Sequence, residues 1–415
     1  MSTATLAVTT PAAAPASDVT RSMRGSNQRG MRQFNERIVL QAIRRHGAIA
    51  KAELARLTQL SSQTVSVIVE RLLDDGLLLK QERVRGRIGQ PSVPLSLNPE
   101  GAFSVGVQVG RRSLEVLVLD FTGRICHQHV FHYEYPDPDE VFTHIAAALK
   151  RLRRQMGERW SRVVGLGLSA PLFMNQWADL LGPEAAPAMA RWAGVDLQER
   201  VQSLTELSVF FAKDTIAACT AELLQGQGQL LDSFLYVFVG TFIGGGLVLN
   251  GHLLPGERGN AGAIGSLPLG MAGPGTPAQL LEKASGWQLE QALIAAGHDP
   301  QLIHDDAVAE PEYDAFVQPW LATASNAIAM LIASATALLD LDAVVLDGSL
   351  SPRLLEALLT QTRQALEAYQ LVGIVRPGRL EMGQVGAHAR ALGGALLPLH
   401  TLFFPDKDIF LKQEG

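Results

Sequence analysis

The N-terminal part of the chain shows apolar stripes with helical spacing, separated by short breaks. These stripes predict helices at residues 35–45, 51–58 and 60–76. Ser61 or Ser62 is placed to cap the third helix and Gly76 to end it. Two apolar segments follow, at 77–80 and 93–97, on either side of a polar loop. The pattern therefore predicts three helices and then a pair of strands.

Beyond residue 100 the apolar pattern changes to that of β-strands. Alternation over 103–110 and 114–120 predicts a hairpin, and the run at 234–239 predicts a buried strand. After that strand, Gly244-Gly245-Gly246 is expected to open a turn before the apolar run at 247–249. Glycines let an anion approach backbone N–H groups, so such a turn suits phosphate. A tight structural hairpin is the alternative.

Charge divides the chain into two parts. The 415 residues carry a formal net charge of −6. Residues 1–98 hold 14 Lys and Arg against 7 Asp and Glu, whereas residues 99–415 hold 21 against 34. A basic head on an acidic body indicates that the head alone binds a polyanion.

Length and composition favour a cytoplasmic protein of two or three domains. Residues 1–25 are rich in Ala, Thr and Pro and lack the features of an export signal, so a disordered tail is expected. No uninterrupted apolar run reaches the roughly 18 residues of a membrane span. Cys126 and Cys219 are the only two cysteines, and they provide no disulfide framework.

The predicted third helix carries side chains suited to DNA recognition. Three helices joined by short turns form a helix-turn-helix, whose third helix enters the major groove. Short polar side chains there can bond to base edges, and a basic one can hold a phosphate. The residues expected to contact DNA are Ser61, Ser62, Gln63, Thr64, Ser66 and Arg71. The alternative is an ordinary three-helix bundle with a solvated polar face.

The loop between the two predicted strands has the composition of a wing. Arg83, Arg85 and Arg87 alternate along it, and such arginines can enter a narrow minor groove. Residues 26–98 are therefore predicted to form a winged helix-turn-helix that binds double-stranded operator DNA. One winged helix contacts too few base pairs for strong discrimination, so a homodimer or homotetramer is expected.

Residues 240–266 carry a longer motif, GTFIGGGLVLNGHLLPGERGNAGAIGS. It resembles the second phosphate loop of the ROK family (repressor, open reading frame, kinase), whose pattern is roughly GTGIGGG, NG and AGEIGH. The head similarly resembles the winged head of ROK repressors, although Gly89-Gln90-Pro91 stands in place of their usual Gly-Arg-Pro. The resemblance covers nearly the whole chain after residue 25 and identifies a ROK-type regulator with degenerate kinase and zinc motifs.

The resemblance also implies a fold and domain boundaries. The fold class is α/β, with the winged helix-turn-helix followed by a two-lobed, actin-like (ribonuclease H-like) ATPase-fold body at 100–415. Lobe 1 is expected at about 100–215 together with the C-terminal helix, and lobe 2 at about 216–385.

The chain departs from the kinases of the family where nucleotide phosphates bind. Kinases end the first strand with Asp-x-Gly-Gly-Thr, whereas this chain has Gln108-Val109-Gly110-Arg111-Arg112. Losing the carboxylate that organises Mg²⁺ should severely impair phosphoryl transfer, which depends on positioning and on charge neutralisation. Arg111 and Arg112 could instead accept the phosphate of an effector. Surface arginines in a lengthened turn are the alternative.

The sugar-binding positions implied by the resemblance are partly altered. Asp214 stands where the kinases carry their catalytic base, but Lys213 replaces the adjacent Asn and could lower the basicity of Asp214. A helix N-cap is the alternative role for Asp214. Ala263 and Ser266 replace the Glu and His of Glu-x-Gly-His. The residues expected to bind the ligand are Ser169, Lys213, Asp214, Gly245, Asn260, Ser266 and Glu282.

The zinc motif of the family is missing from this chain. Thiolate and imidazole bind structural Zn²⁺, and residues 267–277 contain neither Cys nor His. We therefore expect no zinc, and we predict neither another metal, nor a cofactor, nor a catalytic residue.

Three functional hypotheses follow. The leading one is a transcriptional regulator, a repressor of carbohydrate-related genes, that responds to a sugar or sugar derivative and is not an enzyme. The second is an active sugar kinase with an added DNA-binding head, supported by Asp214 and the intact glycine triplet. The third is a regulator whose body no longer binds sugar and serves oligomerisation, consistent with Ala263 and Ser266.

Overall fold

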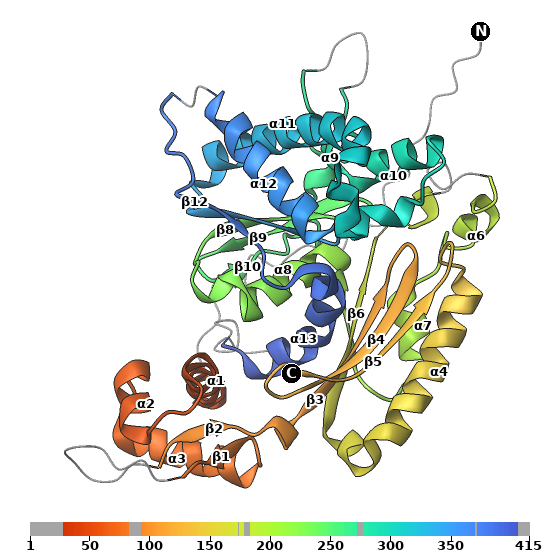
Figure 1. The fold of residues 1–415 in the computed structure, drawn as a ribbon. Helices are drawn as coiled ribbons and strands as arrows, with labels where there is room; N and C mark the ends of the chain where they lie inside the picture. The colour runs from red at the N-terminus through yellow and green to blue at the C-terminus, as the bar shows by residue number, and fades with distance from the viewer. Residues whose placement is uncertain are drawn as a thin grey trace.

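In the computed structural model, a small helical head precedes a larger body of two lobes (Figure 1). The structure describes residues 28–82, 93–172, 174–177, 183–271, 277–369 and 372–405. The predicted change from a helical head to an α/β body is confirmed.

The head consists of three helices and a two-stranded sheet. Its elements are α1 (Gln28–His46), α2 (Lys51–Thr58), α3 (Ser62–Asp74), β1 (Leu78–Lys80) and β2 (Leu95–Leu97). Ser61 caps α3 by accepting a hydrogen bond from the Thr64 N–H at 3.1 Å, and Gly76 follows the helix with φ of 71°. β1 and β2 pair antiparallel, so the predicted strand pair is confirmed.

Helix α1 is longer than the apolar pattern predicted. It begins at Gln28 rather than at Asn35. The buried stripe of α1, which includes Val39 and Ile43, starts only after the first two turns. The spacing of apolar residues therefore did not predict helix for residues 28–34.

Lobe 1 is a five-stranded sheet with the order β5-β4-β3-β6-β7. Its elements are β3 (Phe103–Val109), β4 (Ser113–Asp120), β5 (Ile125–His132), α4 (Pro138–Met156), β6 (Val163–Ala170), α6 (Ala186–Ala190), α7 (Leu197–Gln202) and β7 (Val209–Lys213). Helix α4 packs a buried stripe, including Ile145 and Leu152, against the sheet. Strands β3, β6 and β7 run parallel, so their carboxyl ends meet at one edge.

Lobe 2 is a second five-stranded sheet, with the order β10-β9-β8-β11-β12. Its elements are β8 (Phe234–Val239), β9 (Ile243–Leu249), β10 (His252–Leu253), α9 (Leu280–Ala284), α10 (Gly286–Ala295), α11 (Asp314–Leu339), β11 (Ala343–Gly348), α12 (Pro352–Glu367) and β12 (Arg379–Met382). Helices α11 and α12 cover the outer face of this sheet (Figure 1).

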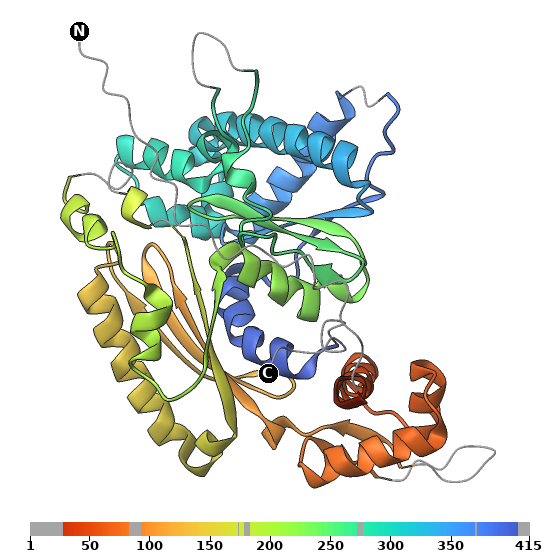
Figure 2. The ribbon, with the colours of Figure 1, turned by 180° about the vertical axis from the view of Figure 1, so that it is seen from behind.

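Two helices lie between the sheets and connect the lobes. They are α8 (Asp214–Gln225), which follows β7, and α13 (Ala389–Phe403), near the end of the described chain; both views show them between the sheets (Figure 1, Figure 2). The helices approach closely because Gly393 of α13 faces the backbone of Ala217 in α8, where a Cβ atom has no room. Their contact fixes how the two sheets are placed relative to each other.

Gly244, Gly245 and Gly246 do not form the turn that we expected. They lie inside β9, in register with residues 238, 237 and 236 of β8, and the turn is formed by residues 240–242 instead. A Cβ atom on Gly246 would lie 2.5 Å from the Cβ atom of Cys219 in α8. The glycines therefore let α8 pack directly on β9, and the prediction of a glycine turn was wrong because the pattern cannot separate the two uses.

Helix α11 belongs to the one described segment whose helix length and mean hydropathy match those of a membrane span. Pro311–Leu339 is long and apolar enough to cross one, with a mean hydropathy of 1.6. However, 61% of its apolar window is buried inside the protein, where Trp320 and Ile328 belong to the core of lobe 2. The apolar composition of α11 is therefore explained by its position in that core.

The close packing of α8 on β9 gives a stability prediction. Gly246→Ala should lower the free energy of unfolding by roughly 1–3 kcal/mol, because the added methyl group overlaps Cys219. Denaturant unfolding measures this change. Gly378→Ala is the control, because the nearest atom to its Cβ is 3.7 Å away. Equal stability of both variants would contradict the packing role of Gly246.

Candidate functional site

A cavity of about 1110 Å³ lies between the lobes. Its walls come from the carboxyl ends of the parallel strands of lobe 1, the turn between β8 and β9, and the residues that begin α8 and α13. Ligands of open α/β sheets bind at such strand ends, because the loops that follow the strands converge there. The cavity is therefore the candidate site for a small molecule.

Asp214 is held at the start of α8, inside this cavity. The residue is 8% exposed, and its Oδ1 accepts a hydrogen bond from the Thr215 N–H at 2.8 Å. The other carboxylate oxygen lies 3.9 Å from Nη1 of Arg390 in α13. Burial lowers the pKa of the adjacent Lys213 amine, an effect that the Asp214 carboxylate opposes. Both residues face the cavity, so the local hydrogen bond of Asp214 does not exclude ligand contact.

Four of the seven residues expected to bind the ligand line the cavity, namely Lys213, Asp214, Asn260 and Ser266. The other three do not. Ser169 is fully buried and donates a hydrogen bond to the carbonyl of Arg390 at 3.0 Å.

Gly245 and Glu282 are absent from the cavity lining for different reasons. Gly245 lies in β9, where a Cβ atom would overlap the carbonyl oxygen of Tyr236, so the glycine serves strand packing. Glu282 turns back along α9, and its Oε1 accepts a hydrogen bond from the Gln279 N–H at 3.1 Å. Its carboxylate stabilises the helix end rather than facing the cavity.

His388 and Glu115 form a polar pair that sequence reasoning missed. His388 Nδ1 lies 3.2 Å from Glu115 Oε1, which also accepts a hydrogen bond from Gln128 Nε2 at 2.6 Å. The hydrogen bond to Glu115 raises the pKa of His388 above its ordinary value of 6.5, while burial opposes the change. The only sequence signal for this pair and for Arg390 is two basic residues within an Ala- and Gly-rich segment.

Two buried carboxylates fix the backbone that leads into α13. Asp347 accepts hydrogen bonds from the Tyr236 hydroxyl at 2.8 Å and from the Gly386 N–H at 3.2 Å. Glu222 of α8 accepts from the N–H groups of Gln384 and Val385 at 3.1 and 3.2 Å. Burial raises the pKa of both carboxyls, and the hydrogen bonds oppose it. Within the described ranges, no group of three or more His, Cys, Asp or Glu could hold a metal ion.

The turn between β3 and β4 carries Arg111 and Arg112, which reach across to lobe 2. Both guanidinium groups approach one oxygen of Glu290 in α10, at 3.4 and 3.3 Å. Arg111 also stacks on Trp287, 4.8 Å from the ring centre. These arginines are therefore not surface residues of a lengthened turn, which was the alternative considered from the sequence.

The exposed side of α3 is the candidate DNA surface. Ser61, Ser62 and Gln63 are exposed, and Thr64 and Ser66 are half-buried. Thr64 shares a hydrogen bond of 2.8 Å with Ser61, so it contributes to the helix cap. Val67, which is 61% exposed, lies on the same helix and was not predicted from sequence. The short polar side chains near Val67 indicated DNA contact in the sequence, whereas a single valine gives no such indication.

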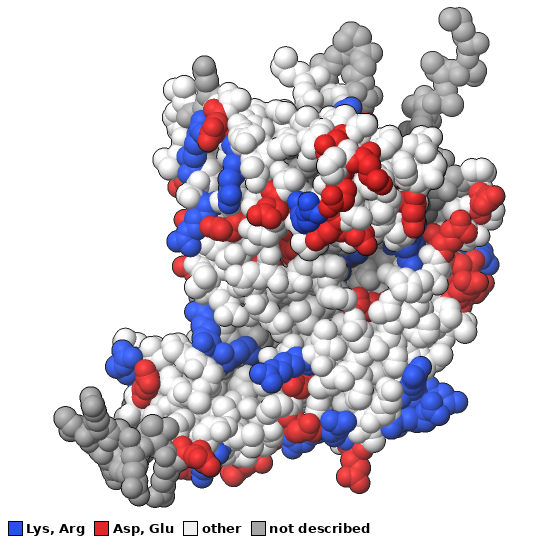
Figure 3. Space-filling view, viewed as in Figure 1, with Lys and Arg blue, Asp and Glu red and all other residues white. Residues whose placement is uncertain are grey.

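Arg71, the residue on α3 predicted to hold a DNA phosphate, already has a partner in the head. Nη1 of Arg71 lies 2.6 Å from Glu36 of α1, so its charge is paired within the head. Arg83, Arg85 and Arg87 lie outside the described residues. Lys and Arg side chains also gather where the head meets the body, whereas Asp and Glu dominate lobe 2 near α9 and α10 (Figure 3).

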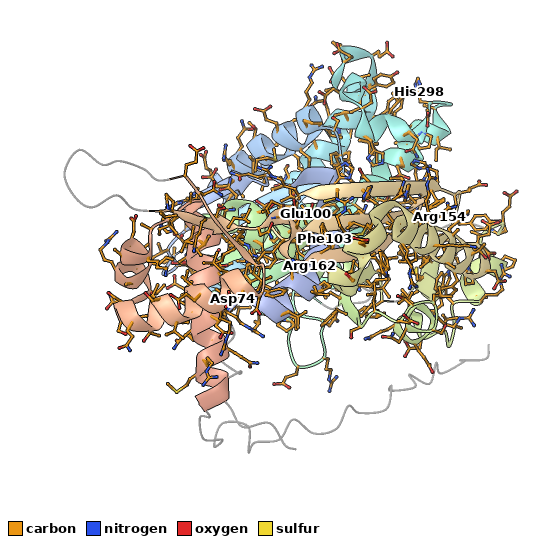
Figure 4. The ribbon with its side chains drawn as sticks, turned by 90° about the horizontal axis from the view of Figure 1, so that it is seen from below. Asp74, Glu100, Phe103, Arg154, Arg162 and His298 are labelled. Atoms are coloured by element: carbon orange, nitrogen blue, oxygen red, sulfur yellow. The ribbon has the colours of Figure 1, made fainter. Side chains whose placement is uncertain are left out.

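The head is attached to the body through α1 and through the start of lobe 1. Arg44 lies 4.2 Å from the ring centre of Phe404 and 5.5 Å from that of Phe121, and burial lowers its pKa to about 10. Arg162 donates to the carbonyl of Glu100 at 2.9 Å, near the end of α3 (Figure 4). The head therefore contacts both lobe 1 and the end of α13.

The His388–Glu115 pair predicts a pH dependence. Because the folded-state pKa of His388 is raised, the stability that the pair contributes is complete below pH 6.5 and is lost as the pH rises through the folded-state value. NMR titration should give a pKa above 6.5 for His388 and a lower value in Glu115→Gln. The exposed Glu134→Gln is the control, and an unchanged titration in Glu115→Gln would refute the assignment.

Comparison with known proteins agrees with this geometry. Residues 104–400 match the model of the ROK family, and residues 33–88 match that of the MarR family. The xylose repressor of Bacillus subtilis is 24% identical over 249 residues, which are 60% of this chain and 64% of the repressor. A glucokinase of Halalkalibacterium halodurans is 25% identical over 318 residues, which are 71% of this chain and 94% of the kinase.

A solved structure extends the similarity to the whole fold. A ROK family transcriptional regulator, described as a homologue of the MLC protein of E. coli, has 20% sequence identity and a TM-score of 0.65. The match covers 92% of this chain and 98% of that one. The predicted fold class, with its helix-turn-helix head and actin-like body, is thereby confirmed. Since the family model spans most of the body, the chain belongs to the ROK family.

Proposed function

We propose that this chain is a DNA-binding transcriptional regulator, a repressor of carbohydrate-related genes whose effector is a sugar or sugar derivative bound between the lobes. The observation that carries the proposal is the position of α13. Arg390 and Ala391, in its first turn, line the cavity, and its other end contacts the head. The helix has 15 residues, so the two ends are about 20 Å apart.

The contact between α13 and the head supports transmission of a signal. Arg37 donates a hydrogen bond to the carbonyl of Phe404 at 3.1 Å, and Arg44 stacks on the ring of the same residue. One continuous apolar cluster includes Val39 of α1, Ala218 of α8 and Leu399 of α13. A ligand that changes the position of α13 would therefore change the position of the head. The ligand must bind one arrangement more tightly than the other for this to regulate DNA binding.

The cavity supports ligand binding rather than phosphoryl transfer. Gln108 stands at the end of β3, buried at 3% exposure, where the related kinases carry a carboxylate. A neutral amide cannot organise Mg²⁺ as a carboxylate does. The Asp214 carboxylate also lies 3.9 Å from the Arg390 guanidinium, so it already has a contact within the protein.

The second candidate function is an active sugar kinase with a DNA-binding head. The relationship to a glucokinase and the presence of Asp214 in the cavity favour it. Turnover of ATP above background with a panel of hexoses would establish that activity.

The proposed partners follow from the same features. Operator DNA contacts α3 through Ser62, Gln63 and Ser66, with Val67 packing against a thymine methyl group. The arginines of the predicted wing, Arg83, Arg85 and Arg87, contact the minor groove. The protein acts in the cytoplasm, as a homodimer or homotetramer on a symmetric site.

Substitutions on α3 test the DNA-binding surface. Operator fragments are first selected from the DNA of the source organism. Gln63→Ala should then weaken specific binding about tenfold or more, because a base contact is worth about 1–3 kcal/mol, while binding to competitor DNA stays unchanged. Val67→Ala should lower affinity mainly for sites with thymine at one position. Asp74→Glu, at the other end of α3, is the matched control.

The effector role is tested by measuring operator affinity with a panel of sugars and sugar derivatives. A true effector should change operator affinity about 5–150-fold, the usual range of allosteric coupling. Arg44→Met should reduce this change while leaving the affinity for the effector unaltered, because the substitution removes contacts of the head with Phe404 and Phe121, which do not line the cavity. If no compound altered operator affinity, the sugar-sensing part of the proposal would be rejected.

A further inference from the structure

The turn between β3 and β4 is enclosed at one end of the interlobe cavity. Gln108 is 3% exposed, and the side chains of Arg111 and Arg112 are 11% and 31% exposed. Tyr133 fixes the turn by donating its hydroxyl hydrogen to the carbonyl of Gly110 at 2.7 Å. Two guanidinium groups are thus held in a constrained, largely dehydrated position.

The charges at this turn are unequal. Arg111 Nη1 and Arg112 Nη2 share a single carboxylate oxygen of Glu290, and the other oxygen accepts a hydrogen bond from Thr241 at 3.0 Å. Two positive charges therefore face one negative charge. Burial and the neighbouring Arg112 lower the pKa of Arg111 to about 10, while Glu290 opposes them. A second negative group would be stabilised here.

The turn also contains hydrogen-bond donors that lack acceptors. Among the described residues, no acceptor is present for the buried Nε2 of Gln108 or for the Nε atoms of Arg111 and Arg112. All three residues line the cavity. Buried donors without acceptors are costly, and an anion with several oxygens satisfies them together.

The other buried carboxylates that line the cavity, Glu115, Asp214 and Asp347, do not compete for this turn, because each has its own partners. Glu115 is bonded to His388 and Gln128. Asp214 lies near Arg390, and Asp347 accepts from Tyr236. Among the described residues that line the cavity, the Nε of Arg390 also lacks an acceptor, but the sharing of one carboxylate by two guanidinium groups is found at the turn between β3 and β4.

We propose that this turn is a subsite for the anionic group of an effector, a phosphate or carboxylate carried by a small polar molecule such as a phosphorylated sugar or a sugar acid. The anion competes with Glu290 for Arg111 and Arg112. Because Glu290 belongs to lobe 2 and the arginines to lobe 1, this exchange breaks an ion pair between the lobes. The inference rests on the proposed function, since it assumes that the cavity holds an effector.

The full-length protein tests this subsite with inorganic phosphate as the probe. Calorimetry and thermal unfolding are measured in phosphate and in chloride of equal ionic strength. Wild type should bind phosphate, and its melting temperature should be higher in phosphate than in chloride. Glu290→Gln should bind phosphate about tenfold more tightly, because the amide replaces the competing carboxylate while preserving the shape. Equal or weaker phosphate affinity in Glu290→Gln would overturn the proposal.

A second variant separates binding from folding. Arg111→Gln combined with Glu290→Gln removes the cation without leaving a buried carboxylate unpaired, so the protein should remain folded. Its affinity for phosphate should be at least tenfold lower than that of the single variant Glu290→Gln. Arg154 is an exposed residue of α4, and the variant Arg154→Ala should therefore behave as wild type (Figure 4). Undiminished affinity in the double variant would show that the arginines only connect the lobes.

Phosphorylated and carboxylated sugars are then compared with their neutral parents for binding and for operator release. Anionic compounds that bind more tightly than the parents, and lose this preference in the double variant, would support the subsite. Operator release by neutral sugars alone, with no phosphate binding, would reject the subsite and leave the proposed function standing. Phosphate binding, with no compound of the panel changing operator affinity, would instead reject the sugar-sensing part of the proposed function and keep the subsite.

Discussion

The body depends on the close contact between α8 and α13. Each helix begins at the cavity and runs between the two sheets, so the pair forms the mechanical connection of the lobes. The contact is possible because Gly393 lets the backbone of Ala217 approach, and Gly246 lets α8 rest on β9. Protein interiors are close-packed, so a small rearrangement at one end of such a pair is transmitted rather than absorbed.

Several residues at which this chain departs from the pattern of the related kinases have structural roles in this arrangement. Arg111 and Arg112 join the lobes through Glu290, and Asp347 fixes the segment that enters α13. Residues that in a kinase would leave space for nucleotide and metal instead hold polar contacts across the cavity.

Local features were predictable from the sequence, whereas long-range contacts were not. The helices of the head were predicted because their apolar residues repeat with helical spacing and Ser61 provides a cap. Lys213 and Asp214, which the family resemblance assigned to the ligand site, do line the cavity, at the carboxyl end of β7 and the start of α8. The contact between Arg111 and Glu290 joins residues 179 positions apart, so no local pattern could reveal it. Ser169 and Glu282 do not line the cavity, because the family resemblance fixes the position of a residue but not the direction of its side chain.

Arg44 of the head stacks on the rings of Phe121 and Phe404 of the body. This contact limits how freely the head could be exchanged for that of a related protein. A cation–aromatic contact removed from water contributes up to about 2 kcal/mol, and its geometry suits a planar guanidinium better than an ammonium group. A head transplanted from a relative without arginine at this point of α1 would fold, yet it would lose its orientation relative to Phe404. Substitutions at the exposed face of α3 leave this contact intact, whereas changes on the side of the head that holds Arg44 have to be matched by changes around Phe404.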